Sequence, residues 1–157
     1  MAAPRQKVVL ITGCSSGIGL WIATLLAKDE QQRYYVIATM RNLQKKERLL
    51  EAVGEAIKDR HIDILINNAG VGLVSPVECV SMEEVRSVFE TNVFGVIRMI
   101  KAVIPDMKKR RAGHIIVISR TMGLQGVVFN DVYAASKFAV EGFCESLAVQ
   151  LLKFNIK

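Results

Sequence analysis

Short runs of β-branched residues alternate with longer stretches of helical periodicity along this chain, and no other feature constrains the fold as strongly. The strand-like runs are residues 7–12 (KVVLIT), 34–39 (YYVIAT), 62–66 (IDILI) and 115–119 (IIVIS). Apolar runs of this kind, separated by helices, are typical of parallel strands that are covered on both sides. The alternation therefore predicts an α/β fold, a doubly wound parallel sheet with helices on both faces.

Four segments have the apolar spacing of helices, namely residues 17–26, 43–56, 82–104 and 132–154. Ser81 is expected to cap the third helix, because Glu84 follows it at the spacing of a capping box. We expect this helix to end at Ile104, since Pro105 comes next and proline disrupts a helix interior.

The chain has 157 residues, a length that suits one domain, so the sequence predicts a single domain over residues 1–157. Its 21 Lys and Arg residues exceed its 15 Asp and Glu residues by 6, and this excess favours anionic partners such as phosphorylated cofactors. The densest basic run, 108–111 (KKRR), is interpreted as a solvated helix end. Contact with a membrane or with nucleic acid is the alternative, and the lack of interleaved aromatic residues weakens the nucleic-acid reading.

Cysteine and apolar patterns bear on the compartment. Cys14, Cys79 and Cys144 lack the spacing of a metal site or a disulfide framework, which indicates a reducing compartment. His61 and His114 are isolated, so no metal site is predicted. No uncharged apolar run reaches the ~18 residues that a membrane span needs. We therefore expect a cytoplasmic location, with contact at a membrane surface as an alternative.

A glycine-rich loop, TGCSSGIG at 12–19, lies between the first predicted strand and the first predicted helix. Glycines there let the backbone turn sharply, approach a phosphate closely and pack the helix on the sheet. The first helical turn adds unpaired N–H groups and the positive end of the helix dipole. The loop predicts a Rossmann-type dinucleotide site, although its spacing is G-x-x-x-G-x-G rather than G-x-G-x-x-G. The residues assigned to the cofactor here are Gly13, Cys14, Ser15, Ser16, Gly17, Ile18 and Gly19.

The end of the second predicted strand bears on which dinucleotide is preferred. Proteins that prefer NAD usually place Asp or Glu there, hydrogen-bonded to the ribose 2′-hydroxyl. This strand instead runs into Met40 and Arg41. Arg41 can pair with a 2′-phosphate, and Ser15 and Ser16 can add hydroxyl donors, so NADP(H) is the predicted cofactor. The alternative is that Arg41 is a surface arginine at the start of the next helix.

The sequence YAASK at 133–137 begins the last predicted helix. An i,i+4 spacing places Tyr133 and Lys137 on one helix face. An ammonium group beside a phenol favours the phenolate form, which suits an acid/base catalyst. Alone, the pattern Tyr-x-x-x-Lys is weak, because many helices contain it by chance.

Four motifs occur in order along the chain: TGCSSGIG at 12–19, NNAG at 67–70, TNVFG at 91–95 and YAASK at 133–137. Together they resemble the short-chain dehydrogenase/reductase family, and the resemblance covers almost every residue. The stretches VIATMR at 36–41 and FNDVYAASKFAVEGFCESLAVQLL at 129–152 are similar to a branch of that family that acts on steroid and retinoid alcohols.

The resemblance implies roles for individual residues. At the matching positions, Tyr133 gives or takes the hydroxyl proton, Lys137 binds the nicotinamide ribose and assists the tyrosine, and Asn92 holds a water in the proton relay. The residues implied to line the adenosine side of the cofactor cleft are Asn68, Ala69 and Gly70.

The resemblance also implies a reaction and partners. Hydride would pass between the nicotinamide of NADP(H) and the carbinol carbon of a small lipophilic substrate, in a retinol/retinal or a hydroxysteroid/ketosteroid pair. In relatives, helices equivalent to 82–104 and 133–154 form a dimer bundle, so a homodimer is expected.

One position departs from the family pattern. The catalytic serine of the family lies thirteen residues before the tyrosine, and Arg120 stands there in this chain. Ser119 comes one residue too early, and adjacent residues at a strand end point to opposite faces. Arg120 is expected to add a second cation near Lys137 where substrate oxygen should lie. Since losing one oxyanion donor lowers turnover by about 10² or more, we expect impaired activity.

Two stretches of the family pattern are missing from this sequence. Only residues 58–61 separate the second predicted helix from the strand at 62–66, where the family has a further strand and helix. The strand at 34–39 is therefore expected at an exposed edge of the sheet. After Lys157 the family continues with strands and a loop that closes over nicotinamide and substrate. The alternatives to an active enzyme are a catalytically weak dinucleotide-binding or dimerising module, and a partial product that does not fold stably alone.

Overall fold

The computed structural model describes residues 5–40 and 61–157. Within them, four strands form one sheet: β1 (Lys7–Ile11), β2 (Tyr34–Ala38), β3 (Ile64–Asn67) and β4 (His114–Val117). Every neighbouring pair is parallel, and the order across the sheet is β2-β1-β3-β4. The prediction of a parallel α/β sheet is confirmed.

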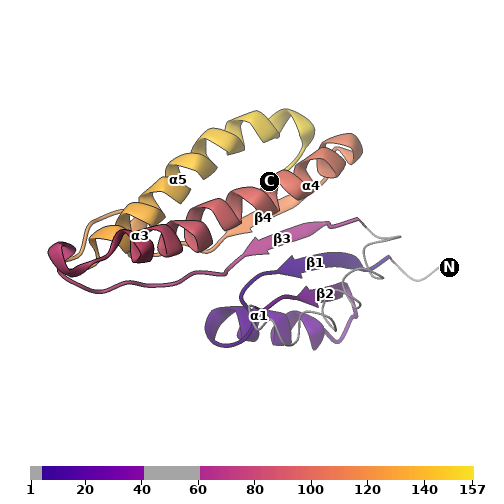
Figure 1. Ribbon diagram of the computed structural model, residues 1–157. Helices are drawn as coiled ribbons and strands as arrows, with labels where there is room; N and C mark the ends of the chain where they lie inside the picture. The colour runs from indigo at the N-terminus through magenta and orange to yellow at the C-terminus, as the bar shows by residue number, and fades with distance from the viewer. Residues whose placement is uncertain (1–4, 41–60) are drawn as a thin grey trace.

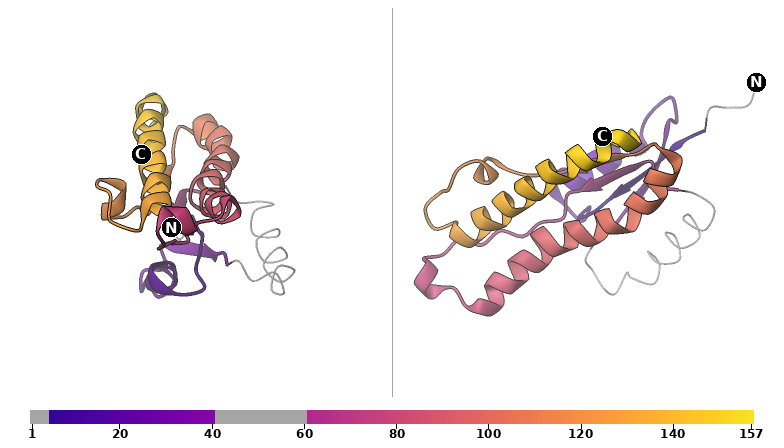
Figure 2. Two further views of the ribbon diagram at one scale, coloured as in Figure 1. Left: turned by 60° about the vertical axis from the view of Figure 1, so that its left-hand side comes forward. Right: turned by 90° about the horizontal axis from the view of Figure 1, so that it is seen from above.

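Helices cover both faces of this sheet (Figure 1). α1 (Gly17–Ala27) lies on one face, and α4 (Gly95–Arg110) and α5 (Asp131–Leu151) lie next to each other on the other face (Figure 2). α3 (Met82–Phe89) leads into α4 through a π-helical turn, η3 (Glu90–Phe94). The predicted helix over 43–56 lies outside the described residues. The remaining short helical turns are η2 (Val77–Cys79), η4 (Thr121–Gly123) and η5 (Leu152–Phe154).

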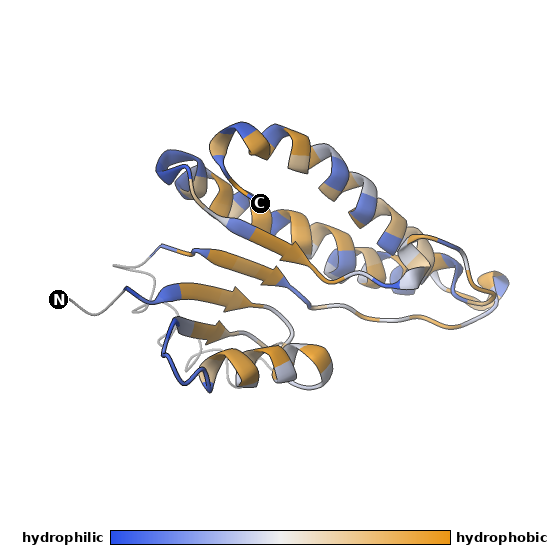
Figure 3. Cartoon of the chain, turned by 180° about the vertical axis from the view of Figure 1, so that it is seen from behind, coloured by the Kyte–Doolittle hydropathy of each residue, from blue (hydrophilic) through white to orange (hydrophobic). Residues whose placement is uncertain are grey.

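β1 supplies the centre of the core, because its side chains alternate between the two covered faces. Val8 and Leu10 pack in the cluster formed with α4 and α5, whereas Val9 and Ile11 pack in the cluster formed with α1. Figure 3 shows β1 and β3 as apolar over most of their length, as expected for strands that are buried on both sides. None of the helices within 5–40 and 61–157 is long and apolar enough to cross a membrane.

The two edges of the sheet differ. In the described part of the chain β2 pairs only with β1, so it is an edge strand of that sheet, as expected from the short connection before β3. At the opposite edge, the last residues lie beside β4. The N–H of Ile115 donates to the carbonyl of Lys157 at 2.8 Å, and the N–H of Lys157 donates to the carbonyl of Gly113 at 3.1 Å.

The prediction that the third helix ends at Ile104 is wrong. α4 continues to Arg110 with Pro105 inside it. Proline removes one backbone hydrogen bond from a helix. However, Val103 and Met107, on either side of Pro105, are 8% and 0% exposed in the core. Burial of these side chains holds the backbone in helical form across the proline.

The basic run at the end of α4 is not simply a solvated helix end. The guanidinium of Arg110 donates to the carbonyl of Ile62 at 2.8 Å and to Asp106 at 2.8 Å. Arg111 has a left-handed backbone (φ 54°), and its side chain donates to the carbonyl of Lys153 at 2.7 Å. These arginines attach the end of α4 to the start of β3 and to the end of α5.

The π-helical turn between α3 and α4 places Asn92 in the protein interior, with 1% of the residue exposed. Its Oδ1 accepts a hydrogen bond from the N–H of Val71 at 2.8 Å. Its Nδ2 donates to the carbonyl of Val71 at 2.9 Å and to the hydroxyl of Ser136 at 3.0 Å. One amide therefore joins the long helix, the loop after β3 and α5. Turns of this kind are rare and are frequent at functional sites.

Asn92→Ala should destabilise the protein, because it leaves the N–H and the carbonyl of Val71 without their partners. We expect the free energy of unfolding to fall by about 1–3 kcal/mol, the cost of leaving a buried polar group unpaired. Urea unfolding measures this change. Asn130→Ala is the matched control, because the side chain of Asn130 donates one hydrogen bond near the surface, to the carbonyl of Val128. Equal losses in the two variants would contradict the role assigned to Asn92.

Candidate active site

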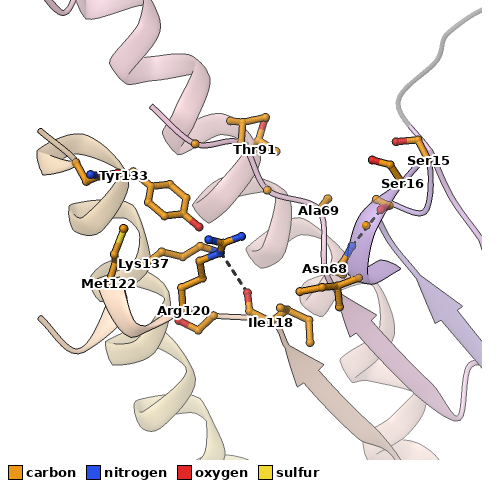
Figure 4. A pocket seen from close by; sticks show the side chains of 18 of the residues that line it. Ser15, Ser16, Asn68, Ala69, Thr91, Ile118, Arg120, Met122, Tyr133 and Lys137 are labelled. Carbon is orange, nitrogen blue, oxygen red and sulfur yellow. Dashed lines mark hydrogen bonds between the residues drawn. The ribbon is translucent and has the colours of Figure 1, made fainter. Parts of the chain in front are cut away.

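A cavity of about 760 Å³ opens where β1, β3 and β4 end and their following loops begin (Figure 4). The chain runs from β1 to one side of the sheet to reach β2, and β3 lies on the other side of β1. Such a switch in direction creates a crevice at the carboxyl ends of the strands, where ligands bind in open α/β sheets. The lining residues are Gly13, Ser15, Ser16, Gly17, Ile18, Asn68, Ala69, Gly70, Val71, Gly72, Val74, Thr91, Ile118, Ser119, Arg120, Met122, Asn130, Tyr133 and Lys137.

The glycines of the loop after β1 have separate structural reasons. Gly13 has φ +73°, and a Cβ there would lie 2.7 Å from the Cα of Ala69. Gly17 also has a left-handed backbone (φ +59°), but the space around it is open on the cavity side. A side chain on Gly19 would collide with the amide of Asn68. The loop therefore needs glycine at 13 and 19 to pack against the turn after β3, whereas at 17 the need is conformational.

Asn68 and Thr12 join the loop after β1 to the turn after β3. The Nδ2 of Asn68 donates to the carbonyls of Thr12 and Gly13, each at 3.0 Å. The hydroxyl of Thr12 accepts hydrogen bonds from the N–H groups of Asn68 and Ala69 at 3.1 and 3.0 Å. The side chain of Asn68 thus holds the cavity wall together, and the sequence did not reveal the part played by Thr12.

The first turn of α1 can accept phosphate. Ser16 is the residue before the helix, and its side chain makes no capping hydrogen bond. The first turn contains no acidic residue. Backbone N–H groups at a helix start that lack a cap attract anions. Because Ser15, Ser16 and Gly17 line the cavity, these donors fit a pyrophosphate there.

Two residues assigned to the cofactor from sequence do not line the cavity, and a third is outside the described residues. Cys14 is 2% exposed and packs in the core cluster with α1, where its thiol donates to the carbonyl of Ile11 at 3.4 Å. Burial raises the pKa of this thiol. Gly19 contacts Asn68 rather than the cavity. Arg41 lies outside the described residues.

Tyr133 and Lys137 lie together on α5, at the end of the cavity opposite the serines of the glycine loop (Figure 4). The Nζ of Lys137 lies 5.7 Å from the centre of the Tyr133 ring and donates to the carbonyl of Ile118 at 3.1 Å. Lys137 is only 6% exposed. Burial lowers the pKa of its ammonium group and the positive charge of Arg120 lowers it further, whereas Glu141 acts in the opposite direction.

The departure at residue 120 lies within this cavity. Arg120 follows β4, and its side chain points to the same region as those of Tyr133 and Lys137 (Figure 4). The hydroxyl of Ser119 is buried and finds no hydrogen-bond partner among the described residues. It lies against Gly123 instead, 2.8 Å from where a Cβ on that glycine would be. Both Ser119 and Arg120 line the cavity, and Figure 4 shows the Arg120 side chain near those of Tyr133 and Lys137.

Several lining residues escaped the sequence analysis. They follow β3 and β4 or lie on the helices beside the cavity, and their side chains carry no distinctive chemistry. For those that follow β3 and β4, the position at the end of a predicted strand was the available signal, because parallel strands end at one edge of a sheet. Thr91 in η3 and Asn130 before α5 gave no such signal. The residues that escaped the sequence analysis are Val71, Gly72, Val74, Thr91, Ile118, Met122 and Asn130.

Comparison with known proteins agrees with the motifs and the geometry. Residues 28–157 match the family model of short chain dehydrogenases. The chain belongs to this family. The resemblance identified from the four sequence motifs is therefore confirmed, and the family is one of oxidoreductases that use nicotinamide dinucleotides.

Two human relatives show how much of a family member is present. The chain is 55% identical to retinol dehydrogenase 8 over 178 aligned positions, which cover 99% of the chain and 57% of the relative. It is 44% identical to 17-beta-hydroxysteroid dehydrogenase type 1, with 96% and 54% covered. The chain thus spans little more than half the length of these relatives. Since the first alignment has 178 positions and the chain 157 residues, at least 21 positions (178 minus 157) of that alignment have no counterpart in this chain.

Solved structures agree on the fold. A short-chain dehydrogenase from Streptomyces avermitilis has a TM-score of 0.82 and 32% identity, covering 98% of this chain and 64% of that one. ElxO with NADP bound has a TM-score of 0.84 and 27% identity, covering 98% and 71%. The doubly wound fold of this family is therefore retained in the shortened chain.

Arg120→Gln should raise the pKa of Lys137, because it removes a positive charge that opposes the ammonium form. In the unchanged protein, the folded state releases the Lys137 proton at a lower pH than the unfolded state does, because the pKa is lowered from 10.5 on folding. Between the two pKa values the unfolded state binds more protons than the folded state, so the free energy of unfolding increases as the pH rises through this interval. In Arg120→Gln the pKa of the folded state lies closer to 10.5, so this pH interval becomes narrower. NMR titration of the lysine Cε resonances measures the pKa directly. Arg86→Gln on the surface of α3 is the control, and an unchanged Lys137 pKa in Arg120→Gln would contradict the coupling.

Proposed function

We propose that this chain is an NADP(H)-dependent oxidoreductase that interconverts a lipophilic alcohol and its carbonyl compound, with activity impaired by Arg120. The single observation that carries this proposal is the continuous cavity from the uncapped start of α1 to Tyr133 and Lys137. The names of the human relatives, retinol dehydrogenase 8 and 17-beta-hydroxysteroid dehydrogenase type 1, support a retinol/retinal or a hydroxysteroid/ketosteroid pair as substrate.

The glycine loop and the turn after β3 would hold the cofactor. Ser15, Ser16 and Gly17 offer N–H groups and hydroxyls to the pyrophosphate, and Asn68 to Gly70 form the wall beside the adenosine. Lys137 lies where it can bind the nicotinamide ribose. A bound nicotinamide dinucleotide supplies hydride transfer to or from the carbinol carbon.

Tyr133 would move the proton at the substrate oxygen. Its phenolic hydroxyl can give or take a proton, and the Nζ of Lys137 lies 5.7 Å from the centre of its ring, so a cation stands beside the reacting group. Asn92 acts on this pair through Ser136, the residue next to Lys137. Both Nδ2 protons of Asn92 are already donated, so a relay water in this proposal bonds to the main chain of the π-helical turn.

NADP(H) is proposed over NAD(H) from the charges near the cavity. β2 ends in Ala38, and neither Thr39 nor Met40 supplies the carboxylate that binds a ribose 2′-hydroxyl in NAD-preferring proteins. Ser15 and Ser16 are exposed and lie in the loop that would face a 2′-phosphate. The solved relative ElxO was obtained with NADP bound, which supports the same choice.

A second candidate is a dinucleotide-binding or dimerising module with little turnover. The observation that favours it is Arg120, a long cation in place of the compact hydroxyl that the family uses. α5 exposes Phe138 and Val149, which are 46% and 71% exposed, and these side chains offer apolar surface to a second copy.

Thermal unfolding and turnover, measured on the same purified chain, test the proposal. NADPH should raise the melting temperature more than NADH does. Tyr133→Phe should keep this shift and lower reduction of all-trans-retinal or estrone by about 10²–10⁴, because it removes the proton donor. Arg120→Ser should raise turnover by about 10² if an oxyanion donor is what the chain lacks.

The outcomes separate the two candidates. Stabilisation by NADPH without turnover, even in Arg120→Ser, would favour the binding module. If neither NADPH nor NADH stabilises the protein, the cofactor site is assigned wrongly.

A further inference from the structure

Two cations share the reactive end of the cavity without an acid. Of the lining residues, Arg120 and Lys137 are the charged ones among those the structure describes, and no Asp or Glu joins them. The phosphate-binding serines lie at the opposite end, on the loop after β1 (Figure 4). The charge at the tyrosine end therefore calls for an anion other than the cofactor phosphates.

No nearby carboxylate neutralises this pair. Glu141 follows Lys137 by one helical turn and is close enough to affect its pKa, but it lies against Gly123, outside the cavity lining. Neither Arg120 nor Lys137 forms an ion pair in the described ranges, unlike Arg33, Arg98 and Arg110. Like charges that share a partly enclosed site repel each other, and a bound anion removes that repulsion.

The side chains around the cations indicate what the anion is attached to. Ile118 and Met122 lie near Arg120 and Lys137 in the cavity (Figure 4), so apolar side chains stand beside the two charges. A guanidinium group is planar and presents paired N–H donors that match the two oxygens of a carboxylate. A neutral hydroxyl or carbonyl group would leave both positive charges uncompensated.

We propose that Arg120 and Lys137 form a binding site for the carboxylate of a lipophilic monocarboxylic acid. Arg120 donates two parallel hydrogen bonds to the carboxylate, and Lys137 on α5 adds a second positive charge. The acid binds without reaction and occupies the space of the alcohol or carbonyl compound. The inference rests on the proposed function in one respect, that the tyrosine end of the cavity is the substrate end.

Binding of 4-phenylbutanoate and of 4-phenylbutan-1-ol, followed by NMR titration of the full chain with and without NADPH, tests this site. The two probes share their apolar part and differ in the charged end. We expect the acid to bind at least about tenfold more tightly than the alcohol, since each 1.4 kcal/mol of interaction changes affinity tenfold. Arg120→Gln should remove this preference, because it weakens binding of the acid at least about tenfold more than binding of the alcohol. Arg120→Lys should retain part of the preference for the acid, and the surface control Arg86→Gln should retain all of it.

Equal affinities for the acid and the alcohol would overturn the inference. So would an Arg120→Gln variant that binds the acid normally, or one that loses affinity for NADPH alone, because the arginine would then serve the cofactor. Thermal unfolding of each variant confirms that it is folded. Preference for the acid in a protein that NADPH does not stabilise would refute the proposed cofactor site and leave the carboxylate site standing, so the two failures are distinguishable.

Discussion

The hydrogen bonds from the Asn68 amide to the carbonyls of Thr12 and Gly13 fix the geometry on which the rest of the site depends. β1 and β3 are neighbours, and the loops that follow them leave in different directions at the switch point of the sheet. Without a link between these loops, the start of α1 and the turn after β3 would be free to move apart. Gly19 makes the link feasible, because any larger residue would displace the amide.

A second link continues from that turn to α5. The side-chain amide of Asn92 is hydrogen-bonded to the N–H and the carbonyl of Val71 and to the hydroxyl of Ser136 on α5. Lys137 is therefore placed by its own helix, by the carbonyl of Ile118 and by a neighbour that is tied to the opposite wall. Burial lowers the pKa of the Lys137 ammonium group, and the positive charge of Arg120 lowers it further. Arg120, which stands where the family has a serine, adds a second cation to the end of the cavity where Lys137 lies.

The sequence indicated much of the fold because strand runs and glycine turns are local signals. The runs at 7–12 and 34–39 correspond to β1 and β2, and the loop between β1 and α1 lies as expected. Pro105 does not end the helix, because burial of Val103 and Met107 outweighs the local preference of proline. The π-helical turn left no trace in the apolar spacing. Its importance comes from contacts of Asn92 with residues far along the chain, and no periodicity reports those.

The site was predictable to the extent that it consists of motifs. Tyr133, Lys137 and the turn at 68–70 meet at one cavity, and the position of Arg120 follows from counting back from the tyrosine. The side chain of Cys14 belongs to the core instead, because the turn at Gly13 (φ +73°) ends the alternation of β1 and leaves Cys14 in the same cluster as Val9 and Ile11. The hydroxyl of Thr12 and the carbonyl of Ile118 are invisible to motif analysis, since each acts only through a partner brought near by folding.

The central claim is that one nicotinamide dinucleotide lies across the ends of β1 and β3, from the start of α1 to Lys137. Hydrogen exchange followed by mass spectrometry, with and without NADPH, tests this most directly. The account predicts slower exchange in 13–19 and 68–72 and around Lys137, with no change over η2 and the start of α3. Protection confined to other segments, or none at all, would contradict it.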